Sequence, residues 1–271
     1  MKVIYRISDN SYDKPKLPGC TKQFCLDNFL ESFSKIDYVI ADNCQDSTIK
    51  MLRDRKLNII ETKLGNAGSF LFSLNYVLDN IDCKQEETVY FVEDDYIHKK
   101  YENLLDDGLV FADYVTLYDH PDKYTSSYEY GEICKVRKYK NNYWRSSIST
   151  TMTFASKIKT LRQDRQIFHD FCHGKFHPND HMIFQKLFHE NKKQLYLVIP
   201  SAAFHADVRS NLLHDIENDI EPWVIEILEC ELKKQICKTN PSALEQIDNF
   251  ENIQGFKKLL LLNQVKSSQI L

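Results

Sequence analysis

Three consecutive carboxylates, Glu93-Asp94-Asp95, are the residues of this chain best suited to bind a cation. The apolar run Thr88–Val92 leads directly into them, and its β-branched and aromatic residues predict a buried strand. Neighbouring carboxylates repel one another, so burying them together is costly unless a cation compensates their charge. Hard ions such as Mn²⁺ and Mg²⁺ favour oxygen ligands and bridge diphosphate oxygens. The cluster therefore predicts a metal–diphosphate site, against the alternative of a solvated acidic turn or helix start.

The elements around this cluster alternate between short apolar runs and helical patterns. Strands are expected at Lys2–Ile7, Tyr38–Ala41, Asn58–Glu61, Thr88–Val92, Tyr114–Tyr118, Thr150–Ala155 and Tyr196–Ile199. Helices are expected at Thr21–Phe33, Asp46–Asp54, Ala67–Asn80 and Lys99–Phe111. Strands separated by helices of about ten to fifteen residues are typical of βαβ units. The sequence thus predicts an α/β fold with a mixed, mainly parallel sheet flanked by helices, which binds ligands beyond the carboxyl ends of its strands.

The length of 271 residues suits one domain with a tail. We expect a main domain over residues 1–215 and a helical extension over residues 216–271, with helices at Glu221–Lys238 and Phe250–Val265. The second of these helices is rich in leucine and lysine, so it could lie on a membrane surface or join two copies into a homodimer. Packing on the domain itself is the expectation we favour.

Composition narrows the class of protein and its location. A formal net charge of −4 leaves no basic excess, which disfavours nucleic acid as a partner. The eight cysteines include no CxxC pair, which favours reduced thiols. The first residues read straight into a strand without a signal segment, and no apolar run approaches the roughly 20 residues that span a bilayer. We therefore expect a cytoplasmic protein, peripheral to a membrane if the last helix binds one.

A polar stretch, Asp119–Trp144, follows the strand expected at Tyr114–Tyr118. Segments of this length within a compact domain are more often functional loops or lids than plain connections. Trp144 and the hydroxyl groups of Ser146–Thr153 could contact a sugar. A hydroxyl-rich strand with one anchoring tryptophan explains the same residues equally well.

The acidic cluster at a strand's end resembles the DxD-type motif of glycosyltransferases with the GT-A fold. Ile40–Thr48 is similar to the acidic turn that reads the nucleoside in family-2-like transferases, and Asn66-Ala67-Gly68-Ser69 resembles the Asn-x-Gly helix beside the sugar nucleotide. The likeness covers about residues 1–210 and extends to small glycosyltransferases of algal-virus type. It implies that residues 1–215 form a Rossmann-like GT-A catalytic domain. Such a domain would move a sugar from a nucleotide sugar, expected to be a UDP-sugar, to a glycan or other hydroxyl acceptor.

The resemblance also implies roles for single residues. Asp42 would contact the base or ribose, and Asp95 would hold Mn²⁺ or Mg²⁺. Glu93 or Asp94 would face the ribose and diphosphate. Which carboxylate has which role stays open, because a glutamate replaces the usual first aspartate of the motif. The remaining donor-site residues that it implies are Arg6, Ser8, Asp9, Asn66 and Gly68. N–H groups at the start of the helix near Ala67 could add an anion site, although a simple turn and cap is the alternative.

Two residues further along the chain would complete the site. Asp180 would act as the general base that deprotonates the acceptor hydroxyl, which implies inversion; a place in the helix cap is its plain alternative. His205 would be another metal ligand, with Asp207 in reserve, or else an ordinary histidine of the fold.

Four histidines recur at every fourth residue: His169, His173, His177 and His181. Their spacing suggests zinc, but Gly174 and Pro178 interrupt any single helix that could carry them all. A zinc site is therefore the weaker hypothesis.

Two other functions remain open on the sequence. A sugar-phosphate nucleotidyltransferase also places metal-binding carboxylates on such a sheet, but the segment Ser8–Lys14 lacks the glycines that would surround a triphosphate. A non-catalytic module that binds a nucleotide or glycan is the third hypothesis.

Overall fold

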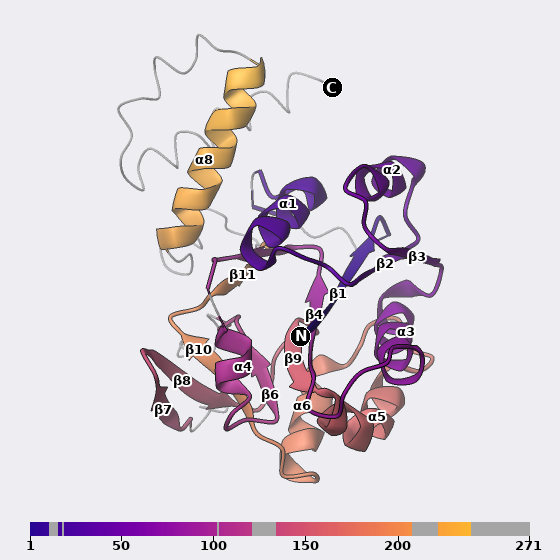
Figure 1. Cartoon of the computed structure of the whole chain (residues 1–271), viewed down its shortest axis with the longest axis vertical. Helices are drawn as coiled ribbons and strands as arrows, with labels where there is room; N and C mark the ends of the chain where they lie inside the picture. The colour runs from indigo at the N-terminus through magenta and orange to yellow at the C-terminus, as the bar shows by residue number, and fades with distance from the viewer. Residues whose placement is uncertain (11–15, 18, 102, 121–133, 208–221, 240–271) are drawn as a thin grey trace.

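The computed structural model describes residues 1–10, 16–17, 19–101, 103–120, 134–207 and 222–239. A nine-stranded sheet in the order β3-β2-β1-β4-β9-β6-β10-β8-β7 lies at the centre, with helices on both faces (Figure 1). Its strands are β1 (Lys2–Ser8), β2 (Tyr38–Asp42), β3 (Ile59–Thr62), β4 (Thr88–Glu93), β6 (Tyr114–Thr116), β7 (Val136–Tyr139), β8 (Asn142–Ser147), β9 (Phe154–Lys157) and β10 (Leu195–Ile199). The helices are α1 (Lys22–Phe33), α2 (Asp46–Asp54), α3 (Gly65–Asn80), α4 (Leu104–Gly108), α5 (Ile158–Cys172), α6 (Asp180–His189) and α8 (Pro222–Thr239).

The first half of the sheet is a parallel unit of β3, β2, β1 and β4. Its two central strands are buried on both faces, because α1 and α2 cover one face while α3, α5 and α6 cover the other. In the strand register Arg6 lies opposite Glu93, and Ser8 lies opposite Asp42. The carboxyl ends of three strands therefore meet at one edge of the sheet.

The second half of the sheet is mixed. β9 is antiparallel to both β4 and β6, β10 is parallel to β6, and β8 is antiparallel to β10 and β7. Only β8 and β9 run against the common direction, so seven of the nine strands point the same way. The predicted fold class, a mixed and mainly parallel sheet flanked by helices, is confirmed.

A short two-stranded ribbon lies beyond the carboxyl end of β4. It pairs β5 (Tyr96–His98) with β11 (Ala203–His205) in antiparallel fashion, with His205 opposite Tyr96. The Ala206 N–H donates to the Asp95 carbonyl at 2.8 Å and extends this pairing. The ribbon therefore brings the segment after β10 back to the acidic cluster.

Several expected boundaries need correction. The strand expected at Thr150–Ala155 is shifted: β9 covers Phe154–Lys157. The hydroxyls of Thr151 and Thr153, before it, accept hydrogen bonds from the Tyr96 hydroxyl and the Glu93 N–H. The helix expected at Lys99–Phe111 shrinks to α4, because its first residues follow the ribbon strand β5 directly. The polar stretch expected to be one long loop contains β7 and β8, and its residues 121–133 lie outside the described part of the chain.

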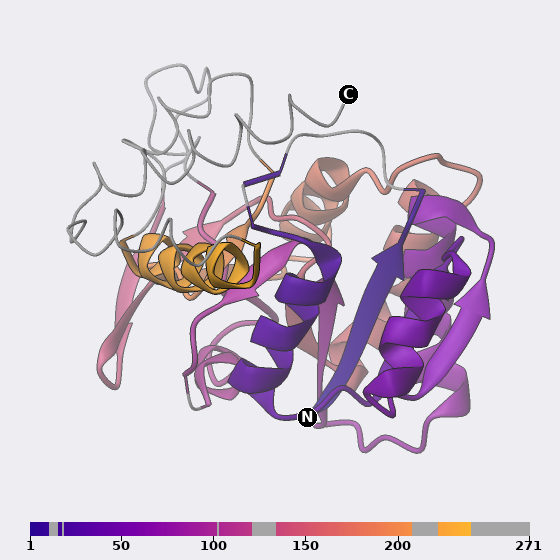
Figure 2. The same ribbon diagram turned by 90° about the horizontal axis from the view of Figure 1, so that it is seen from above.

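Helix α8 lies on the α1 side of the molecule in both views (Figures 1 and 2). Its side chains Val224, Leu228 and Leu232 are buried, and Leu232 packs against Gly19, where a Cβ atom would lie 3.4 Å from it. A helix is thus present at Pro222–Thr239, near the expected Glu221–Lys238, and it contacts the segment before α1. The helix expected at Phe250–Val265 and the boundary at residue 215 lie outside the described residues. Over the described ranges, the helices are too short or too polar to cross a membrane.

A buried histidine links the core to the ribbon. His98 is 1% exposed, its Nε2 lies 2.8 Å from the Tyr90 hydroxyl, and its ring meets Phe29 edge-on at 5.0 Å. Its backbone N–H donates to Asn28 of α1 at 2.6 Å. Burial lowers the pKa of His98 from its ordinary value to about 3, because a charged imidazole would lose its hydration here.

Protonation of His98 should make acid unfold the protein. Below the pKa that His98 has in the unfolded chain, the unfolded state binds a proton at this residue and the folded state does not. The free energy of unfolding therefore falls as the pH falls towards 3. This one group should remove about 1.4 kcal/mol per pH unit between about pH 6 and 4. Urea unfolding at several pH values measures the slope. His98→Phe should flatten the slope by that amount, whereas the exposed His189→Gln should leave it unchanged. An unchanged slope in His98→Phe would refute this account.

Candidate active site

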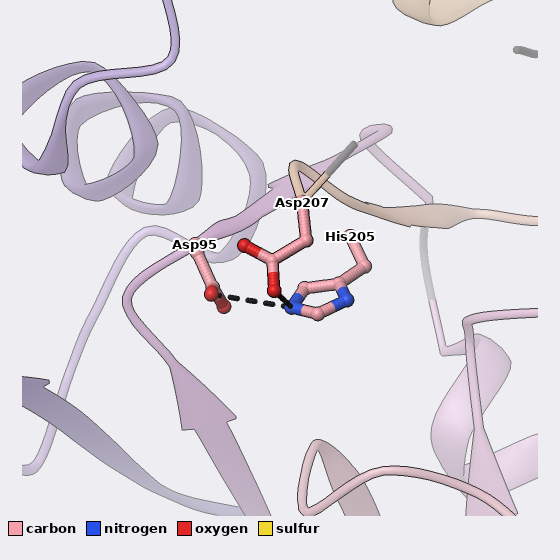
Figure 3. Close-up of side chains that lie close together, drawn as sticks. All are labelled: Asp95, His205 and Asp207. Carbon is pink, nitrogen blue, oxygen red and sulfur yellow. Dashed lines mark ion pairs between the residues drawn. The ribbon is translucent and has the colours of Figure 1, made fainter. Parts of the chain in front are cut away.

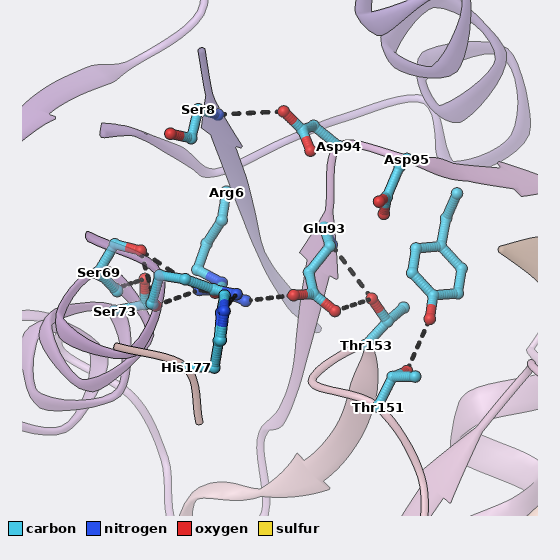
Figure 4. Close-up of polar contacts among 12 residues, drawn as sticks. Arg6, Ser8, Ser69, Ser73, Glu93, Asp94, Asp95, Thr151, Thr153 and His177 are labelled. Carbon is cyan, nitrogen blue, oxygen red and sulfur yellow. Dashed lines mark hydrogen bonds and ion pairs between the residues drawn. The ribbon is translucent and has the colours of Figure 1, made fainter. Parts of the chain in front are cut away.

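Arg6 ties together three elements at the carboxyl edge of the sheet. Its guanidinium is buried, with Nη2 donating to Glu93 Oε1 at 2.7 Å. Nη1 donates to the carbonyl and side-chain oxygens of Asn66 at 3.0 and 3.2 Å, and to Ser69 at 3.3 Å (Figure 4). The group therefore fixes β1, β4 and the start of α3 to one another. Of the expected donor-site residues, Arg6, Asn66 and Glu93 form one connected group.

The first two carboxylates of the cluster have different partners (Figure 4). Glu93 points to Arg6 and Thr153, whose hydroxyl lies 3.4 Å from Oε2. Asp94 points to β1, where its Oδ2 accepts the Ser8 N–H at 3.0 Å. Burial raises the pKa of both groups, that of Asp94 to about 7, and the charge of Asp95 adds to both effects. A cation placed here would offset the repulsion between Asp95 and the two neighbouring carboxyl groups.

The third carboxylate belongs to a separate constellation with His205 and Asp207 (Figure 3). His205 Nε2 lies 3.2 Å from Asp95 Oδ2 and 3.6 Å from Asp207 Oδ2. One ligand atom from each of the three residues lies within 4.8 Å of the others. Lys16 reaches the same place: its Nζ donates to Asp95 Oδ2 at 2.6 Å and to Asp207 Oδ1.

Electrostatics favours the charged forms of Asp95 and His205 in this constellation. Burial alone would raise the pKa of Asp95, but His205 and Lys16 hold it well below its usual value. Burial likewise would lower the pKa of His205, and the Asp95 and Asp207 carboxylates raise it above its usual value. The His205 ring stacks on Tyr96 at 4.7 Å, and the Tyr96 hydroxyl donates to Thr151 at 2.7 Å. Tyr96 thus fixes the plane of the imidazole.

Asp180 lies at the start of a helix, and its charge is felt by the cluster. It is the first residue of α6, and Asn179, whose side chain accepts the Met182 N–H at 3.3 Å, is the N-cap. The Asp180 charge contributes to the raised pKa of Glu93, which places the two carboxylates within electrostatic reach of each other. The neighbouring His177 lies 3.5 Å from Asn66, which brings this loop to the start of α3. The role of Asp180 as a base stays a prediction.

Asp42 and Asp9 accept hydrogen bonds from backbone N–H groups at the starts of two helices. Asp42 accepts hydrogen bonds from Leu64 N at 2.6 Å and Gly65 N at 3.0 Å, and also from the side chains of Asn43 and Thr62. Asp9 accepts the Gln45 N–H at 2.8 Å. These carboxylates close the turns at the starts of α3 and α2, and their contacts with a nucleoside stay predictions.

One expectation about this edge is wrong, and another stays untested. The N–H groups of Gly65 and Ala67 are bound to Asp42 and to the Phe176 carbonyl, so they do not form the expected anion site. Gly68 lies within the first turn of α3, where a Cβ atom would lie 2.9 Å from Leu64. Its close packing explains the glycine, while its expected contact with a donor stays a prediction.

The expected acceptor contact of Trp144 is also wrong. The side chain is fully buried and packs edge-on against Phe111 at 5.9 Å. Its neighbour Arg145 forms a buried ion pair with Asp119 at 2.6 Å. The tryptophan therefore anchors β8 and does not face a ligand.

The histidine series divides between two elements. His169 and His173 stack at 4.7 Å near the end of α5, whereas His181 lies on α6 with its Nδ1 3.3 Å from the Ser149 hydroxyl. Within the described part of the chain, metal-ligand spacing occurs at Asp95, His205 and Asp207 and not among these four histidines.

Comparisons with known proteins give likenesses of fold. Neither a protein-family model nor a curated protein sequence matches the chain. The solved inositol-1-phosphate CTP transferase from T. maritima is similar at 15% identity, 85% coverage of this chain, 96% of that chain and a TM-score of 0.47. S. aureus TarS 1-349 is similar at 16% identity, with 96% of this chain and 81% of that chain covered and a TM-score of 0.44. The nucleoside-diphosphate-sugar pyrophosphorylase from Vibrio cholerae RC9 is similar at 11% identity, with 76% of this chain and 96% of that chain covered and a TM-score of 0.46. At these values the likenesses do not decide the activity, and the resemblance to algal-virus-type enzymes stays a prediction.

Removal of the Asp42 carboxylate should destabilise the whole domain. Asp42 is 2% exposed, so Asp42→Ala would leave buried N–H groups at the start of α3 without their acceptor. We expect the free energy of unfolding in urea to fall by about 2–4 kcal/mol. The exposed Asp46→Ala, in the first turn of α2, should change it by less than about 0.5 kcal/mol. Equal losses in the two variants would contradict this role for Asp42.

Proposed function

We propose that this protein is a glycosyltransferase that moves a sugar from a nucleotide sugar, in particular a UDP-sugar, to a hydroxyl group of a glycan or similar acceptor, with Mn²⁺ or Mg²⁺. The observation that carries the proposal is the grouping of Asp95, His205 and Asp207 beyond the carboxyl end of β4. It lies beside Glu93 and Asp94, which face β1. Ligands of open α/β sheets bind at this edge.

The donor atoms of the constellation fit a divalent ion. Two carboxylates and an imidazole suit Mn²⁺, and the carboxylates suit Mg²⁺. Asp95 Oδ1 is buried and has no hydrogen-bond partner within the described part of the chain, so it retains an oxygen for a ligand. An ion held by Asp95, His205 and Asp207 would supply positive charge for the diphosphate leaving group.

The other residues of the edge would orient the donor. Arg6 and Glu93 form a rigid pair beneath the site, because each is held by several hydrogen bonds. Asp94 and the Ser8 backbone lie at the carboxyl ends of the neighbouring strands β1 and β4, where the nucleoside would bind. The proposal therefore places the nucleoside over β1 and β2 and the diphosphate next to Asp95.

Asp180 is the proposed base for the acceptor. It begins α6 across the edge from β4, and its first-turn position leaves it partly exposed. A carboxylate there could accept the proton of an acceptor hydroxyl as the sugar is transferred, which corresponds to single displacement with inversion. The nearby hydroxyl of Thr151 and the imidazole of His181 could contact sugar hydroxyls.

Incubation with a panel of UDP-sugars and Mn²⁺ tests the class of reaction. We expect release of UDP that depends on the ion and on one sugar, first by slow hydrolysis and faster with the right acceptor. A nucleotidyltransferase would instead release pyrophosphate from UTP and a sugar phosphate, and that product would overturn the proposal. Binding without any turnover would indicate the non-catalytic module.

Asp95→Ala should abolish the metal-dependent part of donor binding, because it removes the oxygen ligands that follow β4. Calorimetry with UDP and Mn²⁺ should show at least a tenfold weaker Kd, equivalent to about 1.4 kcal/mol. Asp37→Asn is a matched control, since this carboxylate is similarly shielded but accepts the Val3 N–H at the opposite edge of the sheet. Unchanged affinity in Asp95→Ala would remove the metal site from the proposal.

Asp180→Asn should separate catalysis from binding. The amide cannot accept the acceptor's proton, so kcat should fall by about 10²-fold or more while the Kd for UDP-sugar stays near that of the wild type. Glu190→Gln, at the other end of α6, should retain full activity. Full turnover by Asp180→Asn would reject this residue as the base.

A further inference from the structure

A lysine side chain occupies the position between Asp95 and Asp207 that an ion would take. Lys16 Nζ donates to Asp95 Oδ2 at 2.6 Å and to Asp207 Oδ1. Asp95 Oδ2 is also the oxygen that lies 3.2 Å from His205 Nε2. The ammonium therefore contacts both carboxylates of the constellation.

An ammonium and a divalent ion cannot share this position. Both need the same oxygen lone pairs, and two cations a few ångströms apart repel each other strongly in a partly buried site. Lys16 and its two partners are largely shielded from water, with 30% of its side chain exposed against 21% for Asp95 and 12% for Asp207. An ion that binds here must therefore displace the lysine side chain.

The backbone holds Lys16 at the site. Lys16 forms a β-bridge with Asp207, and the next residue, Leu17, donates its N–H to the Ala206 carbonyl at 2.9 Å. The Leu17 side chain is 1% exposed, which anchors the segment in the core. Such a tether keeps the local concentration of the ammonium high, whatever the conditions in solution.

We propose that Lys16 is a resident counter-cation of the carboxylate site, which compensates Asp95 and Asp207 when no divalent ion is bound and competes with that ion for them. This inference deepens the proposed function, on whose metal site it rests. Its consequence is a site that stays assembled without metal and binds a divalent ion more weakly than its ligands alone would. The apparent Kd is raised by the inverse of the fraction of molecules in which the lysine has withdrawn.

Titration with Mn²⁺ alone, followed by the electron paramagnetic resonance signal of the free ion, measures this competition without nucleotide or turnover. Lys16→Gln and Lys16→Met should each bind Mn²⁺ about tenfold more tightly than the wild type, if the lysine-free state is about a tenth of the population. Lys22→Gln is the matched control. Lys22 is equally exposed, at 32%, and pairs with Asp9 at 3.2 Å instead of with the constellation, so its loss should change the Kd by less than about twofold.

Thermal unfolding supplies a second readout that does not depend on a measurable wild-type affinity. Without metal, both Lys16 variants should melt below the wild type because Asp95 and Asp207 lose one of their two cationic partners and keep His205 alone of the pair. Mn²⁺ should raise the Tm of the variants by more than it raises that of the wild type. Equal Mn²⁺ affinities and equal Tm increments in the wild type and Lys16→Gln would overturn the inference. If UDP-sugar still binds with Mn²⁺ in that case, the proposed function survives; if Lys16→Gln gains affinity but no UDP-sugar binds, the inference stands and the proposed function fails.

Discussion

Negative charge crowds the end of β4, and the local structure is arranged around its compensation. Each of the three carboxylates has its own partner: Arg6 for Glu93, the Ser8 backbone for Asp94, and the His205–Lys16 side for Asp95. These partners come from β1, from the segment after it and from the end of the ribbon. Because like charges at this spacing are costly to bury, the loss of one partner would raise the pKa of the remaining groups and loosen the edge.

The same requirement explains why distant parts of the chain converge here. The β5–β11 ribbon delivers His205 and Asp207 to Asp95, and the Lys16–Leu17 segment adds to the outer side of that ribbon. Tyr96 pairs with β11 through its backbone and orients the His205 ring by stacking on it. The fold thus places its charged side chains through backbone pairing, which allows the site to persist without a bound ion.

The sequence predicted the parallel half of the fold well, because β4 carries the unbroken apolar run Val89–Val92 and α2 carries a clear helical pattern. It placed the acidic cluster at a strand's end for the same reason. The ribbon was missed because three-residue strands leave no periodic pattern, and Trp144 was misread because aromatic residues suit both cores and sugar sites. Lys16 could not be found from the sequence, since its partner Asp207 is 191 positions away and no local pattern joins them.

The central claim is that Asp95, His205 and Asp207 hold a divalent ion against the diphosphate of a nucleotide sugar. A crystal structure of the protein grown with Mn²⁺ and UDP, with anomalous diffraction to locate manganese, tests it most directly. The account predicts one manganese peak bonded to atoms of all three residues and to diphosphate oxygens, with the Lys16 ammonium displaced from between the carboxylates. A UDP molecule bound elsewhere, or bound at this edge with Lys16 still in place and no manganese, would contradict it.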